Sequence, residues 1–268
     1  MSAARLPTYF ISHGGGPWPW MKEQMGGVYD QLEASLARMP ADIGRTPRAV
    51  LMLSAHWEAP QFTVQTHPQP PMLYDYGGFP DFTYRIEYPA PGAPDVAARV
   101  RAALAAAGIA SQEDAARGFD HGMFAPMAVI YPGADVPVLQ LSLKRGLAPD
   151  EHLALGRALA PLRDEDILIV GSGLSYHNLR AFGPAARAPS AAFDGWLEST
   201  LAIADAATRS ATLAAWERAP AARLAHPREE HLLPLMVALG AAESDAATRA
   251  YHEREFFGGI TVSSYRFG

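Results

Sequence analysis

The sequence predicts a single α/β domain over residues 1–268, with a mainly parallel central sheet and helices on both faces. Four short apolar runs rich in β-branched or aromatic residues read as buried strands, and helical patterns fall between them. Strands that alternate with helices are typical of a parallel sheet. Apolar residues make up 49% of the chain, which is enough for one full core.

The expected elements follow in chain order. The four buried strands are Thr8–Ile11, Ala49–Leu53, Val136–Leu143 and Asp166–Val170, and a further strand that suits a sheet edge is Gly259–Tyr265. The expected helices cover residues 22–39, 95–107, 150–162, 190–207 and 234–242.

The composition excludes several classes of protein. With 22 basic and 28 acidic residues, the net charge is -6, so we expect no nucleic-acid partner. No stretch approaches the ~18 uninterrupted apolar residues of a membrane span, and no secretory signal is visible, so a cytoplasmic protein is expected. The chain contains no cysteine, which excludes disulfides, iron–sulfur clusters and thiol nucleophiles. Any metal must therefore be held by His, Asp or Glu. The sequence leaves a homo-oligomer open.

Residues 67–94 interrupt the alternation of strands and helices. The segment is rich in proline, glycine and aromatic residues. Connections longer than about 12–15 residues are usually functional or disordered. Because of its aromatic content, we expect an ordered loop packed beside a site.

Three of the nine histidines closely follow predicted strands: His13, His56 and His177. In open α/β sheets, ligands bind beyond the carboxyl ends of the strands, so these imidazoles can converge. A fourth, His231, precedes a helix that Pro234 can open, and the positive end of a helix keeps a nearby imidazole neutral. His121 lies on a turn bounded by glycines, where backbone can approach a ligand.

A structural role is the alternative for every one of these residues. A lone histidine after a strand is usually a hydrogen-bonded structural residue, but converging imidazoles without a cation leave lone pairs unmet. His67, His152, His226 and His252 lie in polar or mobile contexts and are assigned structural roles. Four aromatic residues are candidate substrate contacts, and each of them suits the core equally well: Trp18, Trp57, Tyr76 and Tyr176.

Other catalytic motifs fail. Gly171–Ser175 places glycine at the centre of what would be a G-x-S-x-G nucleophile elbow, and no H-E-x-x-H zinc-protease motif occurs. There is no phosphate-binding P-loop, and the only lysines are Lys22 and Lys144.

Seven blocks in order carry a family resemblance, from residue 12 to residue 235: Ser12–Gly14, Ser54–Trp57, Gly77–Pro80, Tyr88–Gly92, Gly118–Gly122, His177–Leu179 and Glu230–Leu235. Together they resemble the class III extradiol ring-cleavage dioxygenases of the LigB superfamily, in particular the DOPA 4,5-dioxygenase type. The resemblance implies that the chain opens a catechol, DOPA-like or other, with O₂ at a mononuclear non-haem metal.

The resemblance also implies roles for the histidines. His13, His56 and His231 resemble metal ligands, His177 either a further ligand or the acid/base beside the metal, and His121 the residue beside the oxygen-binding position. Glu229 or Glu230 could add a carboxylate to the ligands. We expect His177 to accept a proton from the catechol, and the loop 74–88 with Trp18 and Trp57 to hold the ring.

Two questions stay open at this stage. Imidazoles with open positions suit Fe(II), the expected working metal, while an all-histidine set suits Zn(II) equally well. A zinc-dependent hydrolase and a non-enzymatic zinc-binding protein are therefore the alternative functions.

Overall fold

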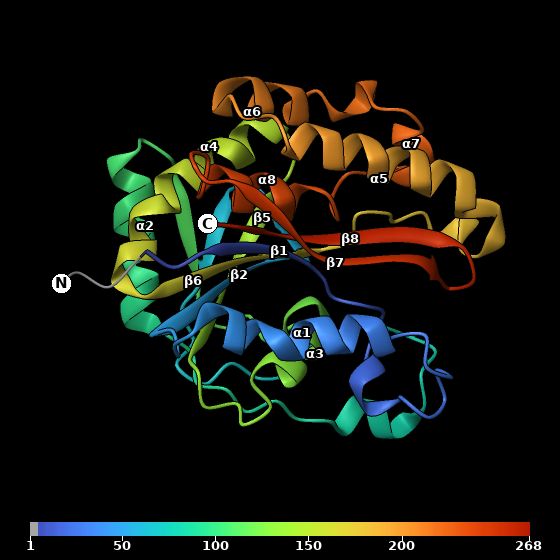
Figure 1. The fold of residues 1–268 in the computed structure, drawn as a ribbon. Helices are drawn as coiled ribbons and strands as arrows, with labels where there is room; N and C mark the ends of the chain where they lie inside the picture. Colours follow the sequence, from blue (N-terminus) through green and yellow to red (C-terminus); the bar gives the residue numbers. More distant parts are fainter. Residues whose placement is uncertain (1–4) are drawn as a thin grey trace.

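The computed structural model, described for residues 5–268, is a single α/β domain built on one eight-stranded sheet (Figure 1). The strand order is β4-β3-β5-β2-β6-β1-β8-β7. The four central strands, β5, β2, β6 and β1, are all parallel, and β8 and β7 add an antiparallel hairpin beside β1. The predicted mainly parallel α/β fold is confirmed.

The strands are β1 (Thr8–Ser12), β2 (Ala49–Ala59), β3 (Phe62–Gln65), β4 (Ser111–Asp114), β5 (Val138–Lys144), β6 (Ile167–Gly173), β7 (Ala247–Phe256) and β8 (Ile260–Phe267). The α-helices are α1 (Asp30–Ile43), α2 (Pro94–Ala106), α3 (His121–Ile130), α4 (Pro149–Leu159), α5 (Arg187–Leu201), α6 (Ala206–Ala214), α7 (Ala222–Ala225) and α8 (Leu233–Gly240).

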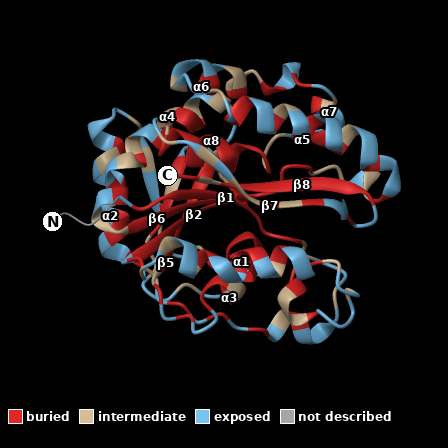
Figure 2. Ribbon diagram, in the orientation of Figure 1, coloured by how far each residue is buried: buried red, intermediate tan, exposed pale blue. Residues whose placement is uncertain are grey.

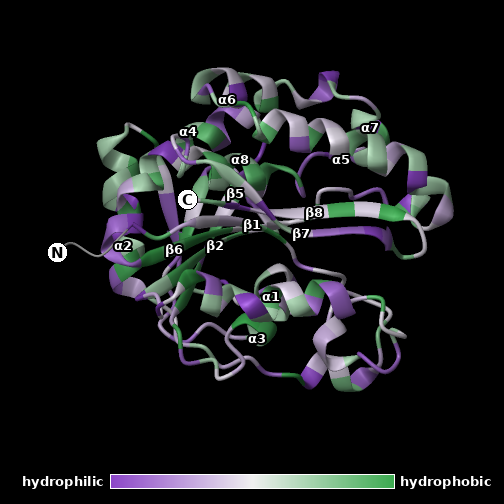
Figure 3. Ribbon diagram, in the orientation of Figure 1, coloured by the Kyte–Doolittle hydropathy of each residue, from purple (hydrophilic) through white to green (hydrophobic). Residues whose placement is uncertain are grey.

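Residues of strand β2 belong to two hydrophobic clusters, one on each face of the sheet. Val50 and Met52 pack toward α1 and α3 on one face of the sheet, while Leu51 and Leu53 pack in a second cluster with α2 and α4. Successive side chains of a strand point to opposite faces, so a run buried on both sides needs no polar residue. Figure 2 shows the central strands buried and the helices exposed on their outer sides, and Figure 3 shows the same strands as hydrophobic.

Among the elements that the sequence missed, four have a local explanation. Strands β3 and β4 have four residues each, and β7 is mostly polar. Helix α3 is apolar on nearly all sides, so it has no amphipathic period. The helix expected over 22–39 begins only at Asp30, because Gly26 and Gly27 take positive φ angles that a helix excludes.

The carboxyl ends of β1, β2 and β6 meet at one edge of the sheet, because the three strands are parallel neighbours. The turn after β1, the loop after β6 and the residues before α8 lie at this edge. Between residues 5 and 268 the structure contains no helix with the length and apolarity needed to cross a bilayer.

Candidate metal centre

Five histidines from distant parts of the chain lie together at this edge. The His13 ring centre lies 4.9 Å from that of His56 and 5.3 Å from those of His121 and His231. The His56 and His231 rings are 4.9 Å apart, and His177 stacks on His231 at 3.3 Å. The structure therefore brings together all five histidines that the sequence singled out.

The ends of the strands position His13 and His56. The backbone N–H of His13 donates to the carbonyl of Gly173, which joins the ends of β1 and β6 (3.1 Å). His56 was expected just after a strand, but β2 continues to Ala59. The pairing of β2 with β5 shifts register between Leu53 and Glu58, so His56 sits in an irregular, bulged stretch. Such bulges often occur next to active sites, where they re-aim a side chain.

His231 reaches the site because β6 ends in glycine. The backbone carbonyl of His231 accepts a hydrogen bond from Leu174 N–H at 3.1 Å. A Cβ at position 173 would overlap that carbonyl oxygen, so only glycine allows this approach.

His121 was expected on a turn, but it is the first residue of α3. Asp120 precedes it, fully buried, and accepts hydrogen bonds from Ser54 Oγ (2.6 Å), Gln140 Nε2 (2.8 Å) and Arg117 Nη2 (2.9 Å). This buried network fixes the start of α3 beside β2, and with it the position of His121.

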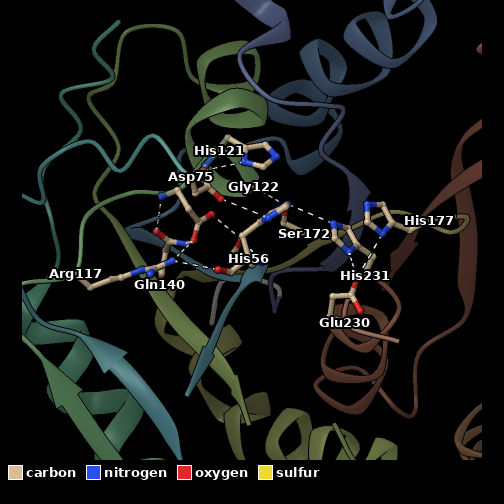
Figure 4. A network of polar contacts seen from close by, with 12 residues as sticks. His56, Asp75, Arg117, His121, Gly122, Gln140, Ser172, His177, Glu230 and His231 are labelled. Atoms are coloured by element: carbon tan, nitrogen blue, oxygen red, sulfur yellow. Dashed lines mark hydrogen bonds and ion pairs between the residues drawn. The ribbon is translucent and has the colours of Figure 1, made fainter. Parts of the chain in front are cut away.

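Two carboxylates each contact the Nδ1 atoms of two histidines (Figure 4). Asp75 Oδ1 lies 2.9 Å from His121 Nδ1, and Asp75 Oδ2 lies 3.4 Å from His56 Nδ1. Glu230 Oε1 lies 2.9 Å from His231 Nδ1 and 3.4 Å from His177 Nδ1. A carboxylate at Nδ1 favours the tautomer whose lone pair is on Nε2, the arrangement common for metal-binding histidines.

Only one of these two carboxylates, Glu230, was expected at the site. Asp75 was missed as a functional residue, although it lies within the aromatic segment expected beside the site. Glu229 and Glu230 were both considered as ligands. The structure separates them, since Glu229 is paired with Arg223 at 2.6 Å while Glu230 contacts the histidines.

The electrostatics keep His13, His56 and His231 neutral, and they keep Asp75 and Glu230 ionised. Burial and the neighbouring histidines hold the pKa of His13 well below its usual value, and burial lowers the pKa of His56 to about 4. Burial also holds the pKa of His231 well below the usual value. Burial raises the pKa of Glu230, but hydrogen bonds from His177 and His231 outweigh this and hold it below the usual range.

Unmet lone pairs show that these residues fit a metal ion. Within residues 5–268, neither ring nitrogen of the buried His13 has a hydrogen-bond partner. His56 Nε2 and His231 Nε2 face each other at 3.3 Å, although both rings carry their Nδ1 atoms toward carboxylates. Neutral imidazole nitrogens so placed are ligands for a divalent cation. The ligand atoms of His13, His56 and His121 lie within 4.8 Å of one another, and those of His177, Glu230 and His231 form a second such group. The contact between the Nε2 atoms of His56 and His231 joins the two groups.

A cavity of about 410 Å³ opens beside the histidines. Its polar end is formed by the histidines and Gly14–Gly16, and its other walls are apolar: Met25, Tyr29, Phe79, Leu174, Leu179, Phe182, Phe256 and Phe257. Larger hollows of about 490 and 470 Å³ elsewhere on the surface have no histidine among their lining residues.

The four aromatic residues expected to hold the substrate do not line this cavity. Trp18 is fully buried and donates its indole N–H to the His13 carbonyl at 2.7 Å. Trp57 is buried and packs under the Arg117 guanidinium, and the buried Tyr176 donates to the carbonyl of Ala181 at 3.0 Å. Tyr76 packs against the His121 ring and donates to the carbonyl of Thr83 at 2.7 Å. Trp18 and Tyr76 therefore support His13 and His121 without lining the cavity.

His152 and His226 have structural roles, as expected, but their surroundings differ from those inferred from the sequence. Both are fully buried instead of lying in polar or mobile surroundings. His152 Nδ1 bonds to the carbonyl of Ala148 at 2.8 Å, and His226 Nε2 bonds to that of Ser175 at 3.0 Å.

Comparison with known proteins decides the family. Residues 7–268 match the model of the catalytic LigB subunit of aromatic ring-opening dioxygenase. The chain belongs to the LigB family. The ring-opening, extradiol dioxygenase function expected from the sequence is thereby confirmed, and neither alternative function is supported.

Individual LigB-family relatives match along nearly the whole chain. A protein of Beta vulgaris named 4,5-DOPA dioxygenase extradiol is 40% identical over 97% of this chain and 96% of its own length. The Escherichia coli K12 protein of the same name is 32% identical over 100% and 97% of the two chains. A crystal structure of an uncharacterized Escherichia coli K12 protein superposes with a TM-score of 0.79 at 28% identity, covering 98% of this chain and 100% of the other.

Proposed function

We propose that this LigB-family chain binds Fe(II) through His13, His56 and His231 and opens the ring of a 4-substituted catechol. The observation that carries the proposal is the orphaned pair of ring nitrogens on buried His13, beside two Nε2 atoms that face each other at 3.3 Å. When bound, iron in such a set of neutral imidazoles supplies a Lewis acid for the catechol hydroxyls and an electron path to dioxygen.

His177 is the proposed base for the catechol proton. It lines the cavity, and its Nδ1 lies 3.4 Å from Glu230 Oε1, which leaves Nε2 for the substrate. Glu230 is ionised, because the histidine hydrogen bonds hold its pKa below the usual range. Its charge stabilises the imidazolium that forms when His177 takes up a proton.

His121 is the proposed donor to oxygen, and it donates from Nε2 as an imidazolium whose charge Asp75 balances. Its Nδ1 and its backbone N–H both bond to Asp75 Oδ1, at 2.9 and 3.0 Å, so the ring is held from one side. Its ring lines the cavity 4.0 Å from the ring of His56, at the opposite end of the histidine cluster from His177. A base on one side and a donor on the other separate the two proton transfers that ring opening needs.

The substrate class comes from the relatives. Several of them are named 4,5-DOPA dioxygenase extradiol, and DOPA is a catechol with a substituent on ring carbon 4. A single aromatic ring with a short substituent also suits a cavity of about 410 Å³.

Anaerobic loading with Fe(II), followed by catechol and air, tests this function. We expect oxygen uptake equal to the catechol consumed and a yellow ring-opened product. Zinc-loaded protein is the matched control and should consume no oxygen. Absence of oxygen uptake by the iron-loaded protein across a panel of catechols would refute the proposal.

A further inference from the structure

The outer part of the cavity has an unusual surface for a site that takes an amino acid. Among the described residues that line it, none is Lys, Arg, Asp or Glu. The charged residues next in sequence to the apolar lining residues are Asp30, Arg180 and Glu255. None of the three lines the cavity, and Glu255 is paired with Arg187. A charged substituent that enters this space finds no ionic partner among the residues that line it.

Aromatic side chains form much of the apolar lining of the cavity, and we call Tyr29, Phe182, Phe256 and Phe257 its aromatic wall. Phe257 contacts Tyr29 (5.7 Å between ring centres), Phe182 (5.3 Å) and Phe256 (4.8 Å). The Tyr29 hydroxyl accepts a hydrogen bond from Gly15 N–H at 3.0 Å. Phe256 and Phe257 lie at the turn of the β7–β8 hairpin, the long pair of strands at the right of Figure 1.

Two members of the lining expose apolar surface at the mouth. Leu179 is 69% exposed and Phe257 is 36% exposed, and they are two of the four large hydrophobic residues exposed in the described chain. Phe257 also has a φ of +48°, a left-handed conformation that bulky residues rarely adopt. Such strain persists where the surrounding structure enforces it, most often at ligand sites.

The position of the histidines fixes how a catechol lies in this cavity. Its two hydroxyls must face the imidazoles, so a substituent on ring carbon 4 extends toward the aromatic wall. We propose that this enzyme selects catechols whose 4-substituent is uncharged and apolar, a short alkyl or similar group, over those with a carboxylate or amino-acid side chain. The inference rests on the proposed function, and it ranks L-DOPA, the compound in the relatives' names, below catechols with an apolar 4-substituent.

The physical basis is desolvation. An alkyl group gains free energy by leaving water for an apolar wall, whereas a carboxylate or ammonium loses its hydration and gains no partner. A pocket built of hydrophobic groups discriminates by about tenfold or more for such changes.

Three catechols with substituents of similar length test the inference: 4-propylcatechol, 3-(3,4-dihydroxyphenyl)propionate and L-DOPA. Their dissociation constants are measured under nitrogen on the iron-loaded protein, and kcat/KM is measured in air, with unsubstituted catechol as the reference. We expect 4-propylcatechol to have a dissociation constant about tenfold lower, or lower still, than either charged compound, and a kcat/KM higher by the same factor.

A matched pair of variants tests whether the cavity lining determines the preference for an uncharged substituent. Leu179→Arg puts a cation at the mouth, so it should shift the ratio of kcat/KM for the propionate over 4-propylcatechol upward by at least about threefold. Leu224→Arg changes a leucine of similar exposure (60%) outside the cavity and should leave this ratio unchanged.

The outcomes separate the two proposals. Binding or turnover of the propionate or L-DOPA equal to that of 4-propylcatechol would overturn the substrate inference and leave the dioxygenase proposal intact. Selective binding of 4-propylcatechol without oxygen uptake would support the inference and refute the proposed function. An unchanged ratio in Leu179→Arg would overturn the assignment of selectivity to this wall.

Discussion

Replacing Glu230 by glutamine removes the charge that holds two of the histidines and leaves the shape of the side chain almost unchanged. The carboxylate oxygen Oε1 serves His231 Nδ1 at 2.9 Å and His177 Nδ1 at 3.4 Å. An amide oxygen can accept from one of these N–H groups, but it cannot supply the charge that supports an imidazolium at His177. One of the two rings therefore loses its partner or its preferred tautomer.

The magnitude follows from the position of Glu230. Its side chain is 15% exposed, so water screens the interaction only weakly. Loss of a carboxylate that orients a metal-binding histidine usually reduces metal affinity or activity by about 10- to 100-fold, which corresponds to about 1.4–2.7 kcal/mol. We expect a loss of this size in kcat/KM of Glu230→Gln with 4-propylcatechol, together with weaker Fe(II) binding in an anaerobic titration and an altered acid limb of the pH–rate profile.

Glu229→Gln is the matched control. It makes the same chemical change one residue away, where the carboxylate pairs with the exposed Arg223, and exposed ion pairs contribute about 0–1 kcal/mol. Its kcat/KM and iron affinity should stay within about twofold of wild type. If Glu230→Gln also stays within that range, the carboxylate does not position the histidines and the reasoning is wrong.

The remaining predictions concern single histidines. His13→Ala should bind no metal, either as purified or after incubation with Fe(II), because the ring nitrogens of His13, which have no hydrogen-bond partner, are proposed to hold the ion. A full equivalent of bound metal by elemental analysis would contradict this. His177→Ala should keep most of its metal but lose about 10²- to 10⁴-fold in kcat, and full activity would exclude it as the base. His152→Gln tests stability instead of catalysis. Burial lowers the pKa of His152 to about 4, from an ordinary value of 6.5, so below pH 6.5 the unfolded chain takes up a proton that the native state refuses. Wild type therefore loses about 2 kcal/mol of stability between pH 8 and pH 5 through this residue. The destabilisation caused by His152→Gln in urea unfolding should be smaller by that amount at pH 5, and an equal difference at both pH values would contradict the assignment.

The sequence predicted the site best where a histidine follows the end of a buried strand. His13 and His177 follow buried runs, and the parallel topology delivers both to one edge. His56 also reaches this edge, although through a bulge within a longer strand, because hydrophobicity alone does not show where a strand ends. Helix α3 was missed because an apolar helix buried on nearly all sides has no period to detect.

The parts of the site that could not be predicted depend on pairings between distant segments. Asp75 bonds to His121 across 46 residues, and nothing near Asp75 in sequence indicates that partner. The aromatic wall combines Tyr29, Phe182 and the β7–β8 turn, which meet only after the hairpin joins β1. Trp18 and Trp57 were expected in the cavity because they lie close to histidines in sequence. Trp57 is adjacent to His56 on a strand, and successive side chains of a strand point in opposite directions.

Diffraction from crystals of the anaerobic, iron-loaded protein, recorded at the iron absorption edge, tests most directly whether these imidazoles share one ion. We expect a single anomalous peak bonded to His13, His56 and His231 at about 2.1 Å, with coordination positions open toward the cavity. A peak bonded instead to His177 and Glu230, or an ion closed by four protein ligands, would contradict it.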